Sequence, residues 1–142
     1  MAEAVMAARM PRGWHGLVEV SSAGTAAWEG ARAARTAVSV LSRAGIDLSS
    51  HRARRVTPDI VERSDLVIAM EEAHREEMVG LVPGSRGRIV VFGELDPSRG
   101  CPDVPDPIGG DEDVYRRTFE EIGLLVALLI SYVSEKYELA ME

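Results

Sequence analysis

The sequence predicts an α/β protein built on a parallel sheet, and three patterns carry that prediction. Residues 66–70 form an apolar run without polar alternation, which is typical of a strand covered on both faces of a parallel sheet. Residues 88–92 predict another strand. Residues 71–82 between them have a helical pattern, so the order is strand, helix, strand. Apolar residues also recur at steps of three and four over residues 115–137, which predicts a long helix packed on the sheet.

The N-terminal part of the chain predicts a helix, a strand and a second helix. Residues 2–10 are good helix formers and end before Pro11. Residues 17–21 alternate in polarity as a strand does, and small residues follow at 22–25. Residues 31–44 place apolar side chains on one helical face, and Gly45 follows where a left-handed helix end needs a glycine. We therefore expect a helix–strand–helix order here.

Local signals then define a short helix and a long loop. Thr57 is a capping residue before Pro58, which favours a helix from Pro58 to about Arg63. The helical pattern of residues 71–82 is stopped by Pro83. Residues 93–110 are crowded with Pro, Gly and Asp, too broken for a regular element. Loops of this length often carry function.

Composition limits the kind of protein this is. The 142 residues predict a single domain spanning residues 1–142, and the formal charge of −7 argues against a broad nucleic-acid surface. The single cysteine, Cys101, allows no internal disulfide and fits a reducing compartment, so we expect a cytoplasmic protein. The apolar run 124–130 is shorter than the ~20 residues that span a bilayer, and no membrane partner is expected.

Four short motifs stand in a fixed order along the chain. They are Ser22-Ala-Gly-Thr, Gly45-Ile-Asp-Leu with His51-Arg-Ala-Arg, the run 64–70, and Asp106-Pro-Ile-Gly-Gly followed by Tyr115. In this order and spacing, from Met1 to about residue 137, the chain resembles the low-molecular-weight protein phosphatases, which include tyrosine and arginine phosphatases. The family's catalytic loop is Cys-x5-Arg-Ser, usually followed by Pro-Met-Ala-Glu, and Met1-Ala-Glu matches the end of that string.

The resemblance implies a three-layer αβα fold with a four-stranded parallel sheet whose first strand is central. That strand and the catalytic loop have no counterpart in residues 1–142, so we expect a chain truncated at its N-terminus. The family's nucleophilic cysteine and phosphate-binding arginine are absent as well. Cys101 is no substitute, because Pro107 stands six positions later and acidic residues fill the segment between them. The chain alone is therefore expected to be inactive.

Asp106 is the expected catalytic residue of this chain. By resemblance it is the general acid that protonates the leaving atom and then activates water. The alternative is a turn aspartate before proline, which is how we interpret Asp96 before Pro97. The glycines that follow Asp106 and the order of the motifs favour the catalytic interpretation.

Three further residues complete the expected site by the same resemblance. Ile108 occupies a substrate-pocket position where many family members carry an aromatic ring, so strict tyrosine specificity is not expected. Ser22 and His51 are expected to support the catalytic loop structurally, with a strand-end turn serine and a loop histidine as the alternatives. His15 and His74 have no partners at metal-ligand spacing, and neither a metal nor a cofactor is implied.

The expected function is dephosphorylation of a phosphorylated protein through a phosphocysteine intermediate, on tyrosine or arginine. Two alternatives stay open. Arsenate reductases share the fold but use additional cysteines, and this chain has only Cys101. A truncated relative kept as a binding or regulatory module would have no catalytic loop at all and would fill the gap in its sheet with a partner strand.

Overall fold

The structure, a computed structural model, describes residues 1–142 as two compact units. The first unit comprises residues 1–22, 32–51 and 107–142, and the second comprises residues 23–31 and 52–106. Each unit is described by itself below, and the single domain expected from the sequence stays a prediction.

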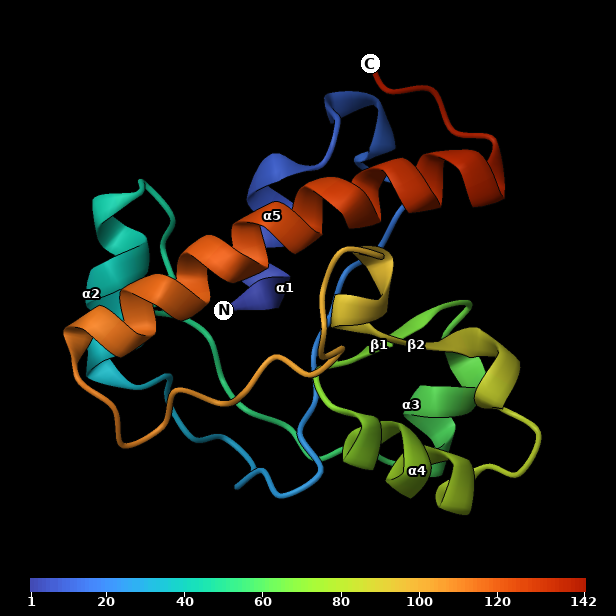
Figure 1. Ribbon diagram of the computed structural model, residues 1–142, viewed down its shortest axis with the longest axis horizontal. Coiled ribbons are helices and arrows are strands. Elements are labelled where there is room, and N and C mark those ends of the chain that lie inside the picture. The colour runs from blue at the N-terminus through green and yellow to red at the C-terminus, as the bar shows by residue number, and fades with distance from the viewer. The chain divides into compact units, whose positions relative to one another are not determined.

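The first unit is helical. Helices α1 (Ala2–Arg9) and α2 (Arg35–Arg43) both pack against the long helix α5 (Glu112–Tyr137), with α2 beside the start of α5 (Figure 1). The core of the unit is formed by side chains that are almost fully buried, among them Val5, Leu41, Ile122 and Val126. Buried members of the apolar stripe that the sequence predicts along α5, such as Ile122 and Val126, therefore contribute to this core.

Side-chain and backbone caps explain where α5 begins and ends. The carboxylate of Asp111 accepts a hydrogen bond of 3.0 Å from the backbone N–H of Val114, which satisfies one of the free donors of the first turn. The helix ends at Glu138, which has a left-handed backbone with φ of 53°. Gly45 likewise has φ of 77° after α2, so the predicted glycine helix end is confirmed.

The C-terminal segment folds back onto the turn that follows α1. Trp14, in the 3₁₀ helix η1 (Arg12–Trp14), is 1% exposed and donates from its indole Nε1 to the carbonyl oxygen of Ala140 over 2.6 Å. The backbone N–H of Gly13 donates to the oxygen of Glu142 over 2.8 Å. The last five residues therefore satisfy polar groups around a buried tryptophan.

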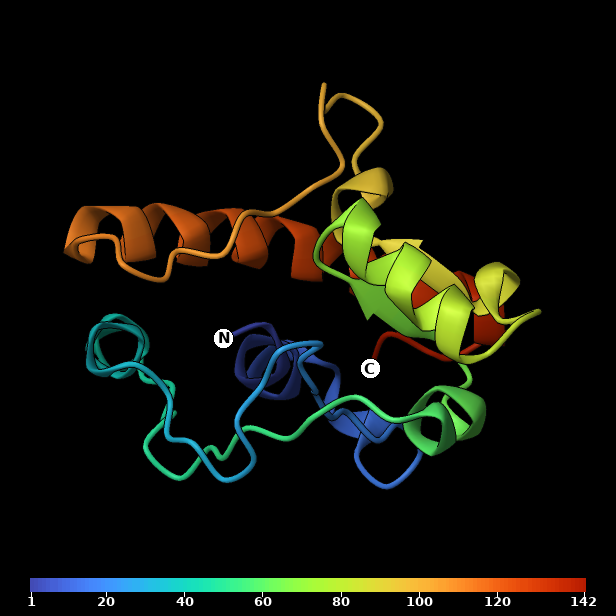
Figure 2. The ribbon, with the colours of Figure 1, turned by 90° about the horizontal axis from the view of Figure 1, so that it is seen from below.

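The second unit contains a two-stranded parallel sheet. Strands β1 (Val67–Ala69) and β2 (Ile89–Val91) pair in register, with Val67 opposite Ile89 and Ala69 opposite Val91. Helix α4 (Glu72–Leu81) connects them and packs against both strands (Figure 2). The predicted order of strand, helix and strand is confirmed.

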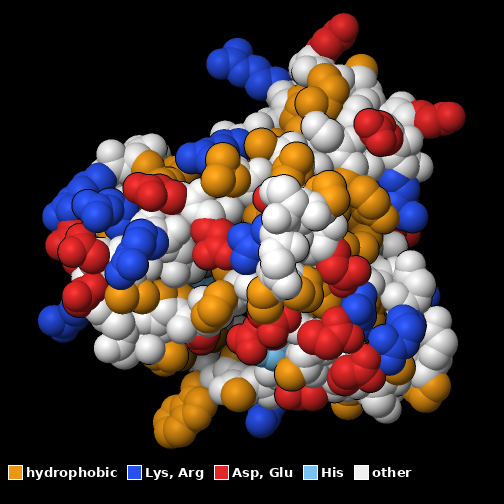
Figure 3. Space-filling model, viewed as in Figure 1, with side chains coloured by type: hydrophobic (Ala, Val, Ile, Leu, Met, Phe, Trp, Pro, Cys, Tyr) orange, Lys and Arg blue, Asp and Glu red, His pale blue; other side chains and the backbone are white.

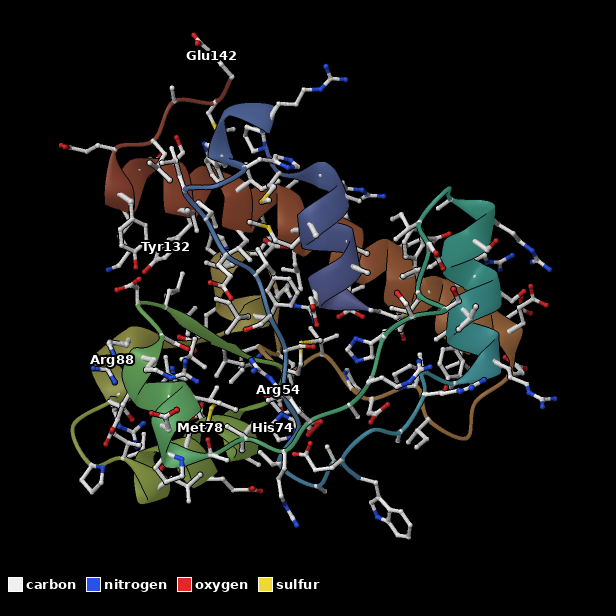
Figure 4. The ribbon with its side chains drawn as sticks, turned by 180° about the vertical axis from the view of Figure 1, so that it is seen from behind. Arg54, His74, Met78, Arg88, Tyr132 and Glu142 are labelled. Atoms are coloured by element: carbon white, nitrogen blue, oxygen red, sulfur yellow. The ribbon has the colours of Figure 1, made fainter.

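Helix α3 (Pro58–Arg63) completes the core of this unit. Thr57 accepts a hydrogen bond from the backbone N–H of Ile60, and Pro58 occupies the first turn, as the sequence predicts. Val61 is buried in one cluster with Met78, Ala69 and the two ends of β2. Arg88, in the 3₁₀ helix η2 (Arg86–Arg88), donates from Nη2 to the carbonyl oxygen of Val61 over 3.3 Å (Figure 4).

The predicted strand at residues 17–21 is wrong. The structure has no strand there, and no backbone ladder includes these residues. A strand is stable only as a member of a ladder, because its backbone polar groups need partners. Val18 and Val20 are nevertheless more buried than Leu17, Glu19 and Ser21. The alternation in polarity therefore correctly indicates which side of this segment is buried, although the segment is not part of a sheet.

Charged side chains of both signs cover the first unit. Over α2 and the start of α5, Figure 3 shows Lys and Arg side chains next to Asp and Glu side chains, and an ion pair joins Arg43 to Glu112. No helix in the structure has the length and apolar character that crossing a membrane would require.

Candidate functional site

The loop that carries Asp106 is tied to the second unit by backbone hydrogen bonds. The N–H of Gly93, in the 3₁₀ helix η3 (Phe92–Leu95), donates to the carbonyl oxygen of Pro102 over 2.9 Å. A Cβ atom at Gly93 would lie 2.3 Å from that oxygen, so only glycine fits there. The N–H of Val104 donates to the carbonyl oxygen of Met70 over 2.8 Å. The loop is thereby fixed at the carboxyl end of β1, an edge where α/β proteins commonly place their sites.

Asp103 adds a side-chain contact to the same anchor. Its Oδ1 accepts a hydrogen bond of 2.9 Å from the backbone N–H of Glu72, the first residue of α4. Its own carbonyl oxygen accepts a hydrogen bond of 3.1 Å from Nη2 of Arg99. Val104, the next residue, is 1% exposed. Two consecutive residues of the loop are therefore held by the strand and helix beneath them.

Asp106 lies two residues beyond this anchor, between Pro105 and Pro107. Its side chain is exposed. Because each proline ring fixes its own φ and restricts the residue before it, the backbone around Asp106 has few conformations open to it. An exposed carboxylate on a stiff, anchored segment can donate a proton to a bound molecule or take one from water.

Ile108 follows in a turn that belongs to the first unit. The N–H of Gly110 donates to the carbonyl oxygen of Pro107 over 2.8 Å, and Gly109 has φ of 81°. The side chain of Ile108 is 77% exposed. It therefore offers aliphatic surface to a ligand but no ring.

Ser22 and His51 meet at one carboxylate in the first unit. The hydroxyl of Ser22 donates to Oε2 of Glu3, and Nδ1 of His51 lies 3.7 Å from the same oxygen. Glu3 is in the first turn of α1, where a negative charge interacts favourably with the helix dipole. The structure thus brings both expected support residues to the start of α1, while Asp106 belongs to the second unit.

Cys101 has no catalytic surroundings. Its side chain is exposed, and its carbonyl oxygen accepts a hydrogen bond of 3.1 Å from Nε of Arg99. The guanidinium of Arg99 is thus engaged with loop carbonyls, and Pro107 stands where a Cys-x5-Arg loop beginning at Cys101 would need its arginine. No group of three or more His, Cys, Asp or Glu side chains in the chain could hold a metal ion.

A charged cluster supports the neighbouring turn. Arg75 of α4 donates to Glu72 over 2.5 Å and to Glu94 over 2.7 Å. Oε1 of Glu94 also accepts a hydrogen bond of 2.9 Å from the backbone N–H of Val91. The cluster links α4 to η3, whose Gly93 holds Pro102.

Asp96 forms a turn contact instead of a site contact. Its Oδ1 accepts hydrogen bonds from the hydroxyl and the backbone N–H of Ser98 over 2.6 and 3.0 Å. These bonds stabilise the charged form and lower the pKa of Asp96 below its ordinary value.

We predict that Ser98→Ala raises the pKa of Asp96 toward its ordinary value, because the stronger of the two hydrogen bonds is lost. A carboxylate whose pKa is lowered by folding contributes stability above its unfolded pKa and loses that contribution as the pH falls through its folded pKa. The measurement is a carboxyl-carbon NMR titration of wild type and variant. An unchanged Asp96 pKa in the variant would contradict the assignment of the shift to Ser98.

Three contacts, one in the second unit and two in the first, were not predicted from the sequence. Asp103 caps a helix that begins 31 positions earlier, and Glu3 binds residues 19 and 48 positions later. Such pairings leave no local pattern. The one indication of a distant cap is that Glu71, the residue before α4, makes no side-chain cap. The first N–H of α4 therefore needs an acceptor from elsewhere in the chain.

Comparisons with known proteins agree with the fold and with the family resemblance. The sequence profile of the family described as low molecular weight phosphotyrosine protein phosphatase matches residues 1–139. The low molecular weight protein-tyrosine-phosphatase Wzb of Escherichia coli K12 is 32% identical over 123 residues, which cover 87% of this chain and 77% of Wzb.

Two solved structures have the same fold. A low molecular weight protein tyrosine phosphatase from T. tengcongensis is 35% identical, with a TM-score of 0.80, and the match covers 92% of this chain and 88% of that one. A mutant of the arginine phosphatase YwlE, with a phosphorylated active-site serine in place of a cysteine, is 30% identical, with a TM-score of 0.83 and coverage of 94% and 86%. The chain therefore belongs to the low molecular weight phosphotyrosine protein phosphatase family, whose α/β fold it shares.

Proposed function

We propose that this chain forms the general-acid part of a protein phosphatase and that the complete protein hydrolyses phosphotyrosine or phosphoarginine through a phosphocysteine intermediate. The observation that carries the proposal is Asp106, an exposed carboxylate held between two prolines on a loop that is anchored to β1 and α4. Family membership supports the reaction class.

The chemistry divides between Asp106 and a catalytic loop. A thiolate attacks phosphorus, the bond from phosphorus to the leaving oxygen or nitrogen breaks, and protonated Asp106 gives its proton to that leaving atom. Ionised Asp106 then takes a proton from the water that attacks the phosphocysteine, which releases phosphate and restores the thiolate. The mutant YwlE structure, with phosphate on a serine that replaces a cysteine, supports a side-chain phosphoryl intermediate.

Residues 1–142 lack two parts of this scheme. Their only thiol is Cys101, and the segment that follows it has no arginine at the required position. In this scheme the nucleophile and the bidentate phosphate ligand are supplied by a Cys-x5-Arg-Ser loop, which the tests below add to residues 1–142. We use the term completed chain for residues 1–142 preceded in frame by the family's first strand and Cys-x5-Arg-Ser loop.

The substrate proposal includes both phosphoamino acids. Wzb is named a tyrosine phosphatase and YwlE an arginine phosphatase, and Ile108 lacks the ring that would stack on a phosphotyrosine. An exposed aliphatic side chain can cover either an aryl ring or the methylene stem of arginine. Steady-state assays of the completed chain with phosphotyrosine and phosphoarginine peptides test this directly, and failure on both would contradict the proposed substrate class.

For the completed chain, we predict that Asp106→Asn lowers kcat about a hundredfold on phenyl phosphate, because its leaving oxygen needs a proton. The loss should shrink with p-nitrophenyl phosphate, whose leaving group departs as a stable anion. Asp96→Asn is the matched control. Asp96 also precedes a proline in this loop, but its carboxylate accepts a hydrogen bond from the hydroxyl of Ser98 and forms a turn. Equal losses on both substrates would contradict a general-acid role.

A further inference from the structure

The segment that carries Asp106 is attached to the rest of its unit at two consecutive residues. The N–H of Val104 is bonded to Met70, directly after β1, and Oδ1 of Asp103 accepts the N–H of Glu72 at the start of α4. Beyond Val104 only Pro105 separates this anchor from Asp106. A displacement of Asp103 or Val104 would therefore displace the Asp106 carboxylate as well.

The cap on α4 comes from the loop and not from the helix's own flank. Glu71, which precedes α4, provides no side-chain cap, so the free N–H of Glu72 depends on Asp103. One hydrogen bond of 2.9 Å thus both caps α4 and anchors the loop. Its loss would free a helix donor and remove one of the loop's anchors at the same time.

From this geometry we propose that Asp103 is a positioning residue for the reaction, which acts by holding Asp106 in place through the cap on α4. The inference rests on the proposed function in one respect, because it takes Asp106 to be the general acid. Asparagine offers the same capping oxygen without the charge, whereas alanine offers none. The two substitutions therefore separate the hydrogen bond from the charge of Asp103.

The first experiment uses residues 1–142 and needs no catalysis. Amide hydrogen exchange at Glu72 and Val104 should become about fivefold faster in Asp103→Ala, the change expected for a lost helix cap. Asp103→Asn should restore rates to within about twofold of wild type. Asp96→Ala, which removes a carboxylate hydrogen-bonded to Ser98 in the same loop, should leave both amides unchanged. Unchanged exchange in Asp103→Ala, or no rescue by Asn, would overturn the proposal.

The second experiment asks whether Asp103 acts through Asp106. In the completed chain, Asp103→Ala should lower kcat on phenyl phosphate about fivefold with KM unchanged, and Asp103→Asn should recover most of it. In an Asp106→Asn background the same Asp103→Ala substitution should change kcat by less than about twofold, because the acid it positions is gone. An equal loss in both backgrounds would overturn the positioning role.

The two experiments also separate this inference from the proposed function. A completed chain without phosphatase activity would contradict the proposed function and the positioning role with it. The exchange rates would still decide whether Asp103 caps α4, since that measurement depends only on the contact between Asp103 and Glu72.

Discussion

Residues 1–142, assayed alone, should hydrolyse p-nitrophenyl phosphate no faster than buffer, and the completed chain should be roughly a thousandfold or more faster. The expected difference is large because the Cys-x5-Arg-Ser loop, present only in the completed chain, supplies both the covalent route and the main stabilisation of the transferring phosphoryl group. Asp106 alone can move a proton but has no phosphoenzyme on which to act. The measurement is the release of p-nitrophenol by equal concentrations of the two purified chains.

Two controls make this comparison specific. Replacing the loop cysteine by serine in the completed chain should return the rate to that of residues 1–142. Cys101→Ser should leave the rate of the completed chain unchanged, because Cys101 is an exposed loop residue without a guanidinium ligand for phosphate. Thiol-dependent turnover by residues 1–142 that disappears in Cys101→Ser would contradict our interpretation of the site.

Trp14→Ala should lower the free energy of unfolding by about 3–5 kcal/mol, the range for deleting a buried aromatic side chain. The indole is 1% exposed, and its Nε1 satisfies the carbonyl oxygen of Ala140. Its removal leaves a cavity and an unpaired carbonyl beside the C-terminal segment. Urea denaturation followed by far-UV circular dichroism measures the effect.

Trp28 is the matched control, since it is the only other tryptophan and is 85% exposed. Trp28→Ala should change the unfolding free energy by no more than about 0.5 kcal/mol. Trp14→Phe should fall between the two, because it keeps a ring in the core, although it loses the hydrogen bond to Ala140 and leaves a smaller cavity. A cost for Trp14→Ala no larger than that for Trp28→Ala would contradict the packing described for Trp14 in the first unit.

Most of the helices could be predicted because their boundaries are set by local chemistry. Thr57 and Pro58 define the start of α3 at the predicted residue. The apolar stripe of α5 predicts its length, although the helix begins three residues before Tyr115, at a cap provided by Asp111. The helix predicted over residues 31–44 is shorter, Arg35–Arg43, and its N-cap residue, Ala34, makes no side-chain hydrogen bond that would mark the start in the sequence.

Strands depended on partners that the sequence pattern does not reveal. β1 and β2 were predicted and pair with each other. Residues 17–21 have a strand-like pattern of their own but no ladder, so the alternation alone was insufficient. Sheet formation is a tertiary event, and a local pattern records only which side of a segment is buried.

The candidate site was predictable where its residues share a motif. Asp106 and Ile108 stand in one short segment, which allowed their roles to be proposed together. Asp103, three residues earlier, carries a contact that depends on the fold of α4. The contacts of Glu3 with Ser22 and His51 bring together three segments that are distant in the sequence. No local motif links these three residues. Motifs therefore predict the chemistry, and the fold supplies the positioning.

The most direct test of the central claim is to read the native gene for about sixty nucleotides upstream of the Met1 codon, enough for the family's strand and loop at ~5–6 strand residues. We expect an uninterrupted reading frame that encodes an apolar strand followed by Cys-x5-Arg-Ser-Pro. An in-frame stop codon with no such motif would contradict the phosphatase proposal, and the non-catalytic binding module would then be the better account of this chain.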